Sequence, residues 1–145
     1  MTYQHILVPV DGSETSYKAI QEAIKFSKSL NSKITLVQVL ELDPYIAEGY
    51  LTTGQTNPFI ERAREYLSQT IADAKQKFQD QGINVETLLL EGISVTDKIL
   101  EAAKDTQADL IIIGSHGRTG LSKLFLGSQT QKVLAQTTIP VLVVR

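Results

Sequence analysis

The chain has 145 residues, no cysteine, and 14 basic against 16 acidic residues, which gives a formal net charge of −2. This length suits one domain with its own core, and the lack of cysteine excludes disulfides, thiolate chemistry and cysteine zinc sites. The near-balance of charge leaves no cationic excess for a nucleic-acid backbone, so we expect no nucleic acid among the partners. No apolar run approaches about 18 residues and no basic leader precedes the first strand pattern, so we expect a cytoplasmic protein with no membrane partner.

The chain opens with alternating strand and helix patterns. A short β-rich run over 5–10 stops at Asp11-Gly12-Ser13, which is typical of a first strand and its turn. A helix is predicted over 14–30, because apolar residues recur on one face and charged residues occupy the others. Asn31 is typical of a left-handed helix stop. The nearly continuous apolar run over 34–42 predicts a second strand.

The stretch between Asp43 and Thr56 shows no regular pattern and contains Pro44, Gly49 and Gly54. We therefore predict an irregular loop there. A loop of this length is uncommon unless it is functional or mobile. Two interpretations remain open, namely a lid over the functional site and a surface insertion held by a small apolar contact.

The second half of the chain continues the alternation. Asn57-Pro58 is typical of an N-cap followed by a first-turn proline, and it predicts a long helix before a third strand over 83–90. Ser94 and Asp97 have the spacing of a helix cap. The remaining predicted elements are a fourth strand over 110–113, a last helix opened by a Ser128-x-x-Gln131 capping box, and a fifth strand over 140–144.

Five strands separated by helical segments predict an α/β fold, a single doubly wound sheet of five parallel strands with helices on both faces. Ligands bind such sheets beyond the carboxyl ends of the strands, where the strand order reverses. The polar turn at Asp11 follows the first strand, and the glycine-rich turn at Gly114 follows the fourth. The two turns share a site only if those strands are neighbours, so we predict the order 3-2-1-4-5 and not 2-1-3-4-5.

The glycine-rich turn has the pattern of a phosphate cradle. The apolar fourth strand stops at Gly114-Ser115-His116-Gly117, and after nine further residues the chain reaches Gly127-Ser128. Glycines after a buried strand, followed by a helix start, let backbone N–H groups converge on an anion. The alternative is a plain glycine turn followed by an ordinary capped helix. If the pattern is a cradle, we expect Gly127→Val to block phosphate approach and to leave the fold intact.

Asp11 has two interpretations at this point. Its carboxylate suits ribose hydroxyls, as in dinucleotide sites, or a phosphate-bound metal. It also suits a helix cap that accepts from the N–H of Ser13 or Glu14. Arg118 and Lys123 lie between the glycines, where they would either reach the phosphates or stay solvated on the surface.

Other familiar site types do not match the sequence. Ser115 and His116 are adjacent in one turn, where triad geometry is rare, and G-x-S-x-G is absent, so we interpret His116 as a turn residue or backbone contact. Neither a Walker loop nor a G-x-G-x-x-G fingerprint occurs. A phosphate-accepting receiver would have an Asp after its third strand, where this chain has Glu91-Gly92.

Three segments resemble the universal stress protein family: residues 6–13, residues 114–128 with a G-2x-G-9x-G-S spacing, and residues 139–144. The resemblance is to the family's ATP-binding branch and covers essentially the whole chain, 1–145, as one nucleotide-binding domain. It implies an α/β protein that binds ATP and is usually cytoplasmic and dimeric.

The resemblance also implies roles for single residues. Asp11 would contact the ribose, and Val39 and Ile113 would line the adenine pocket. Gln129 departs from the small apolar residue that relatives often have, which affects only local contacts near the phosphates. The residues expected near the phosphates are Gly114, Gly117, Arg118, Gly127, Ser128, Gln129 and Thr130.

The last strand indicates a homodimer. It would lie at the edge of the sheet, and the segment from Val141 to Val144 has no charged residue before Arg145. Such an apolar edge invites pairing unless it is covered, so we expect antiparallel pairing with a second copy across a two-fold axis. The alternative is coverage by a loop of the same chain.

Three functional hypotheses follow. The first is a non-catalytic regulatory or sensor module in stress response, in which ATP changes the segment between Asp43 and Thr56. The second is a slow Mg²⁺-dependent ATPase or autokinase with Asp11 on the metal, although no general base or water-positioning residue is evident beside the phosphates. The third is a dimer that holds another adenine nucleotide.

Overall fold

The computed structural model describes residues 3–54, 57–117 and 125–145. Every strand and helix predicted from the sequence is present, and β3 begins and ends slightly later than predicted because its pairing with β2 runs from Glu86 to Gly92. In chain order the elements are β1 (His5–Pro9), α1 (Glu14–Leu30), β2 (Lys33–Glu41), α2 (Pro44–Thr53), α3 (Pro58–Gln79), β3 (Glu86–Gly92), α4 (Val95–Asp105), β4 (Leu110–Gly114), α5 (Ser128–Gln136) and β5 (Val141–Val144).

The strands form one parallel sheet in the order β3-β2-β1-β4-β5, which confirms the predicted fold class and topology. Ile6 of β1 lies opposite Ile34 of β2 on one side and Leu110 of β4 on the other. The strand order reverses at β1 and β4, and this is where open α/β sheets leave a crevice. Asp11 follows β1 and Gly114 ends β4, so both motifs lie at this crevice.

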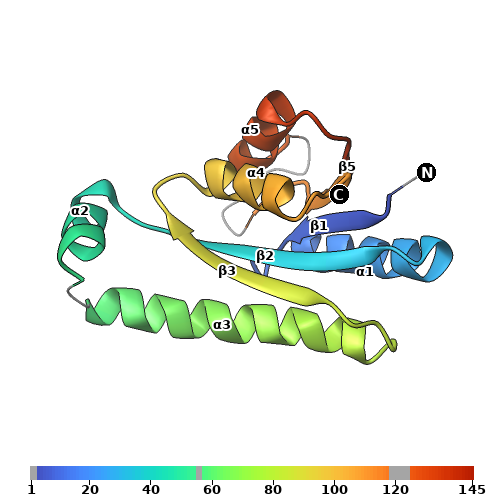
Figure 1. Cartoon of the computed structure of the whole chain (residues 1–145), viewed down its shortest axis with the longest axis horizontal. Helices are drawn as coiled ribbons and strands as arrows, with labels where there is room; N and C mark the ends of the chain where they lie inside the picture. Colours follow the sequence, from blue (N-terminus) through green and yellow to red (C-terminus); the bar gives the residue numbers. More distant parts are fainter. Residues whose placement is uncertain (1–2, 55–56, 118–124) are drawn as a thin grey trace.

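Helices cover both faces of the sheet (Figure 1). Successive side chains of a strand point to opposite faces. In β1, Ile6 and Val8 pack in one cluster with residues of α1 and α3, whereas Leu7 packs in the other cluster with residues of α4 and α5. Both faces of the central strands are therefore buried, which explains their nearly continuous apolar sequence.

Short polar side chains fix the helix ends that the sequence predicted. Ser13 caps α1, with its Oγ accepting from the Ser16 N–H over 3.2 Å, and Asn31 ends this helix in the left-handed region at φ 54°. Asn57 caps α3 through the Phe59 N–H over 2.8 Å, with Pro58 in the first turn. The Ser13 cap begins α1 directly after the polar turn that follows β1.

The predicted irregular loop between Asp43 and Thr56 is wrong over most of its length, because Pro44–Thr53 forms α2. Asp43 opens this helix by accepting the Tyr45 N–H through Oδ1 over 2.8 Å. The Ala47 side chain is buried against Leu40, Leu42 and Ile60. The Asp43-Pro44 pair is itself a helix-start signal, and the contact at Ala47 outweighs the poor helix propensity of Gly49.

The predicted capping box at the start of the last helix is also wrong. Gly127 is the N-cap of α5, and Ser128 is its first helical residue. The Gln131 amide donates instead to the Leu126 carbonyl over 2.7 Å. The first turn of α5 thus begins with a glycine that has no side chain to satisfy its N–H groups.

Candidate functional site

A cleft of about 760 Å³ opens at the carboxyl ends of β1, β2 and β4, between α4 and the start of α5. Nine of the ten residues proposed from the sequence line it, and the tenth, Arg118, lies outside the described residues, as does Lys123. The nine come from four separate stretches of the chain. They are Asp11, Val39, Ile113, Gly114, Gly117, Gly127, Ser128, Gln129 and Thr130.

The Asp11 carboxylate has one oxygen in the local turn and one beside the glycine loop. Oδ1 accepts from the Ser13 N–H over 2.8 Å, and the Asp11 N–H donates to the Ser16 hydroxyl over 3.2 Å. Oδ2 lies so near Gly117 that a Cβ atom there would be 3.0 Å away from it. The capping interpretation therefore accounts for one oxygen only, and the second lies at the cleft.

Gly114 is a glycine because α1 packs directly on it. A Cβ atom at this position would lie 2.5 Å from the Thr15 hydroxyl and 2.8 Å from the Thr15 carbonyl carbon. The Gly114 carbonyl also accepts from the buried Thr130 hydroxyl over 2.8 Å. Gly114 thus joins β4 to α1 and α5, and the group that Thr130 can offer a ligand is its backbone N–H.

Gly127 is required by the backbone of the glycine loop. Its N–H donates to the Ser115 carbonyl over 2.7 Å, and a Cβ atom at Gly127 would lie 2.9 Å from Cα of His116. This close approach argues against the expectation that Gly127→Val leaves the fold undisturbed, and we predict instead that the substitution also lowers stability. Since the Gly127 N–H is used inside the protein, a ligand would meet the next N–H groups, at Ser128, Gln129 and Thr130.

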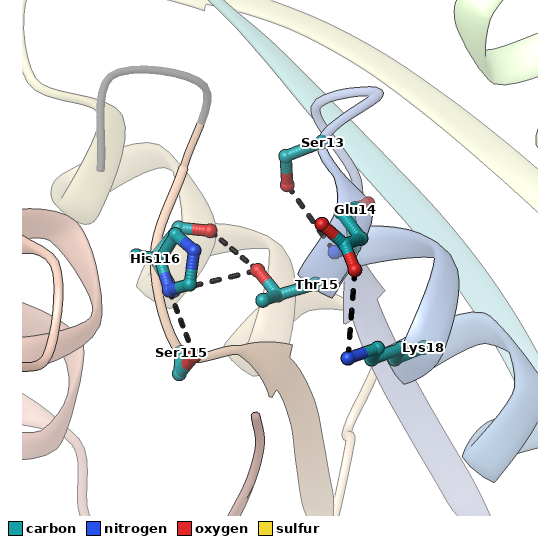
Figure 2. Close-up of polar contacts among 7 residues, drawn as sticks. Ser13, Glu14, Thr15, Lys18, Ser115 and His116 are labelled. Atoms are coloured by element: carbon teal, nitrogen blue, oxygen red, sulfur yellow. Dashed lines mark hydrogen bonds and ion pairs between the residues drawn. The ribbon is translucent and has the colours of Figure 1, made fainter. Parts of the chain in front are cut away.

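The backbone of His116 holds the glycine loop against Thr15 of α1, and the Ser115 hydroxyl contacts the His116 ring (Figure 2). His116 Nδ1 lies 3.0 Å from the Ser115 hydroxyl, and the Thr15 hydroxyl donates to the His116 carbonyl over 2.5 Å. Ser115 is only 2% exposed, so its hydroxyl is out of reach as a nucleophile. The arrangement agrees with a turn and backbone-contact role for His116.

One wall of the cleft is apolar. Val39 and Ile113 pack on the same face of the sheet as α4, and Val95 and Ile99 from that helix complete the wall. An apolar wall opposite a few convergent polar groups is typical of small-molecule sites. It suits a flat, largely apolar group such as a nucleobase.

Several residues of the cleft carry no signal of a binding site in the sequence. Pro9, Val10 and Val37 belong to apolar strand patterns, and the positions of Val95 and Ile99 depend on how α4 lies on the sheet. The clearest overlooked signal was Gln38, a polar residue inside an otherwise apolar strand pattern. The cleft residues absent from the prediction are Pro9, Val10, Ser13, Ser16, Val37, Gln38, Glu41, Leu67, Val95, Ile99, His116 and Lys132.

The side chain of Gln38 is buried beside the cleft. It is 2% exposed, and neither its Oε1 nor its Nε2 has a partner within the described residues. An unpaired buried amide costs stability. The buried, unpaired amide of Gln38 therefore destabilises the fold next to the site.

Across residues 3–54, 57–117 and 125–145, no group of three or more His, Asp or Glu side chains is arranged to hold a metal ion. Likewise, none of the helices in that part of the chain combines the length and apolar character needed to cross a bilayer.

The whole chain matches one known family. A model described as the universal stress protein family covers residues 2–145. The chain belongs to the universal stress protein family. Universal stress protein MJ0531 of Methanocaldococcus jannaschii is 31% identical over 143 residues, which cover 99% of this chain and 82% of that protein.

Solved structures of family members have the same fold. The structure of MJ0577 from Methanocaldococcus jannaschii matches with a TM-score of 0.83 and 29% identity, over 99% of this chain and 96% of that one. A universal stress protein from Archaeoglobus fulgidus, solved in complex with dAMP, matches with a TM-score of 0.70 and 23% identity over the full length of both chains. At this second level of identity the likeness concerns the fold alone.

Proposed function

We propose that this universal stress protein binds ATP in the cleft and acts as a nucleotide-dependent regulatory module in the stress response of the cytoplasm. The observation that carries the proposal is the convergence of three unlike features on one cleft. These are a carboxylate oxygen of Asp11 beside Gly117, the uncapped first turn of α5, and the apolar wall that includes Val39 and Ile113. A ribose, a phosphate chain and a base need these three chemistries.

The phosphates would be held at the start of α5. Backbone N–H groups in a first helical turn have no intrahelical acceptor, and the helix dipole favours an anion there. Each N–H bonded to a charged oxygen contributes about 1.5 to 3 kcal/mol. The N–H groups of Ser128, Gln129 and Thr130, together with burial of the base, suffice for a dissociation constant on the order of micromolar, about −8.2 kcal/mol, after the entropy of association is subtracted.

The ribose and any accompanying Mg²⁺ would lie near Asp11. Its Oδ2 borders Gly117 in the cleft, whereas Oδ1 is used by the Ser13 N–H. Mg²⁺ in nucleotide sites is usually held by one or two carboxylates together with substrate phosphates. The Oδ2 atom beside Gly117 would be the carboxylate oxygen available to such an ion, which would neutralise phosphate charge.

Adenine nucleotides in general are compatible with the fold. The Archaeoglobus fulgidus relative was solved with dAMP, which has a base and sugar of the same class and a single phosphate. Because the two chains share the fold, we propose an adenine nucleotide for the cleft of this chain as well, and that structure has no bearing on the number of phosphates. The choice of ATP rests on the run of N–H groups at α5.

The conformational change that accompanies nucleotide binding would occur at α2. Glu41, the last residue of β2, lines the cleft, and α2 begins three residues later at Pro44. The buried side chain of Ala47 ties this helix to Leu40 and Leu42 at the end of the same strand. A shift of the end of β2 caused by the nucleotide would therefore also move α2, and we propose α2 as the segment that changes conformation on binding.

We also propose a homodimer that pairs through β5. This strand lies at one edge of the sheet, and the four residues from Val141 to Val144 are all partly exposed. A partly exposed apolar edge is stabilised when a second strand covers it. Light scattering should give twice the chain mass for the native protein and the single mass for Val143→Lys. A single mass for the native protein would contradict the dimer.

The nucleotide proposal is tested by mass spectrometry of any small molecule that co-purifies with the native protein, followed by calorimetry with ATP, ADP and AMP. We expect saturable binding that weakens as phosphates are removed. Affinity independent of phosphate number would contradict the assignment of α5 as the phosphate site.

A further inference from the structure

A side-chain bridge joins the first turns of α4 and α5 beside the cleft. The Thr96 hydroxyl donates to Oε1 of Gln129 over 2.8 Å. Thr96 is 2% exposed, whereas Gln129 is half-buried and lines the cleft. The bridge therefore connects a group in the protein interior to one at the proposed ligand site.

The position of Thr96 in its helix explains why its hydroxyl donates across to α5. Thr96 lies in the first turn of α4, whose N-cap is Ser94, and the residue four positions earlier, Gly92, belongs to β3. The common donation of a helical threonine to the carbonyl four residues earlier therefore has no helical carbonyl here, and the Thr96 proton goes to Gln129. A carboxamide that accepts through Oε1 has its two Nε2 protons on the other side.

We propose that Thr96 orients Gln129 so that Nε2 donates to the phosphates of the bound nucleotide. This inference rests on the proposed nucleotide function. The Gln129 side chain belongs to the same first turn that offers backbone N–H groups to an anion, so Nε2 adds donors to that region. Without the Thr96 hydroxyl the amide is free to rotate and turn its carbonyl oxygen, which repels an anion, toward the phosphates.

The proposal gives the two residues different roles. Gln129 is a binding residue that favours phosphorylated ligands over the bare nucleoside, and Thr96 is a positioning residue that acts only through Gln129. A bridge that merely holds α4 against α5 would act differently. Its loss would lower the stability of the fold. It would also lower the affinity for ATP, adenosine and tripolyphosphate by equal factors.

Calorimetry on the full chain with ATP, adenosine and tripolyphosphate separates these roles. Gln129→Leu removes the Nε2 donors but keeps a side chain of similar size. We expect it to lower the affinity for ATP and for tripolyphosphate by about tenfold, while the affinity for adenosine changes by no more than about twofold. Thr96→Val keeps the shape of the side chain but removes the hydroxyl, and we expect a loss of about threefold for the phosphorylated ligands only. In the Gln129→Leu background, Thr96→Val should have no further effect, because the two changes remove one coupled interaction.

Matched controls come from the far ends of the same helices. Gln136→Leu is the same substitution at the exposed end of α5. Thr106→Val is the same substitution at the end of α4, where the hydroxyl donates to the Ala102 carbonyl. Neither residue lines the cleft, so both control variants should bind all three ligands as the native protein does.

Three outcomes decide the inference. Equal weakening of ATP and adenosine binding would overturn it, because a purely structural bridge predicts that result. Additive losses in the double variant would also overturn it, because Thr96 would then act independently of Gln129. If native protein binds tripolyphosphate in a Gln129-dependent way but does not bind ATP, the proposed function fails and the role of Gln129 is supported. If the native protein binds neither ligand, both proposals are overturned.

Discussion

A Cβ atom on Gly127 would lie 2.9 Å from Cα of His116, a separation that real side chains essentially never show. The clash is with backbone and not with the end of a flexible side chain, so the glycine loop or the start of α5 would have to move. Gly127 is thus a structural requirement of the loop as well as a lining residue of the cleft.

Gly127→Val should therefore destabilise the fold in addition to weakening ligand binding. We expect the free energy of unfolding to fall by about 1 to 3 kcal/mol, the usual range for overpacking, as measured by urea denaturation. Gly49→Ala is the control, because nothing lies within 4 Å of a Cβ atom at this helical position. That change should raise stability by about 0.5 to 1 kcal/mol. An unfolding free energy unchanged by Gly127→Val would contradict the close approach to His116.

Gly114→Ala should be more damaging than its small size suggests. The added methyl group would lie 2.5 Å from the Thr15 hydroxyl and 2.9 Å from the Ser16 nitrogen, so α1 would have to move away from β4. We expect a loss of about 3 kcal/mol or more in the free energy of unfolding. Gly54→Ala is not a suitable control because Gly54 has a positive φ. If Gly114→Ala lowered the free energy of unfolding by less than Gly127→Val does, that result would argue against tight packing of α1 on β4.

Substitutions at Asp11 should separate the turn from the ligand contact. Asn at this position keeps an oxygen that accepts the Ser13 N–H, whereas Ala removes it. We expect Asp11→Asn to unfold like the native protein but to bind ATP about fivefold more weakly, because a neutral acceptor bonds hydroxyls less strongly than a carboxylate does. Asp11→Ala should lose affinity and about 0.5 to 1.5 kcal/mol of stability. Native affinity in Asp11→Asn would mean that the carboxylate does not contact the ligand.

Gln38→Leu should stabilise the protein. The Gln38 amide is buried and neither of its polar atoms has a partner among the described residues. Replacing it with an apolar side chain of similar volume removes a penalty of about 1 to 3 kcal/mol, so thermal unfolding should occur at a higher temperature. Gln38→Glu should do the opposite, since it buries a charge. A lower melting temperature for Gln38→Leu would show that the amide has a partner in solution.

Much of the fold followed from the sequence for a physical reason. The turns at Asp11 and Gly114 form one site only if β1 and β4 are neighbours, and this requirement selected the strand order that the structure has. The caps at Asn57 and Ser94 were predictable because a cap depends on residues only two or three positions away. Local chemistry and topology were therefore the predictable part.

The rest depended on contacts between distant residues. The helix α2 was not predicted because Pro44, Gly49 and Gly54 are typical of irregular segments, whereas the burial of Ala47 against distant residues stabilises the helix. Gly127 cannot carry a side chain without a shift, because the backbone of His116, eleven positions away, lies against it. No sequence pattern predicts that these two backbone segments come so close. The bridge from Thr96 to Gln129 spans 33 positions and appears only when α4 and α5 are brought together.

The central claim is that the cleft binds ATP through the start of α5, and calorimetric titration of the intact protein with ATP tests it most directly. We predict saturable binding at one site per chain, with a dissociation constant on the order of micromolar, together with at least tenfold weaker binding of adenosine. No saturable binding of ATP at millimolar concentration would contradict the account.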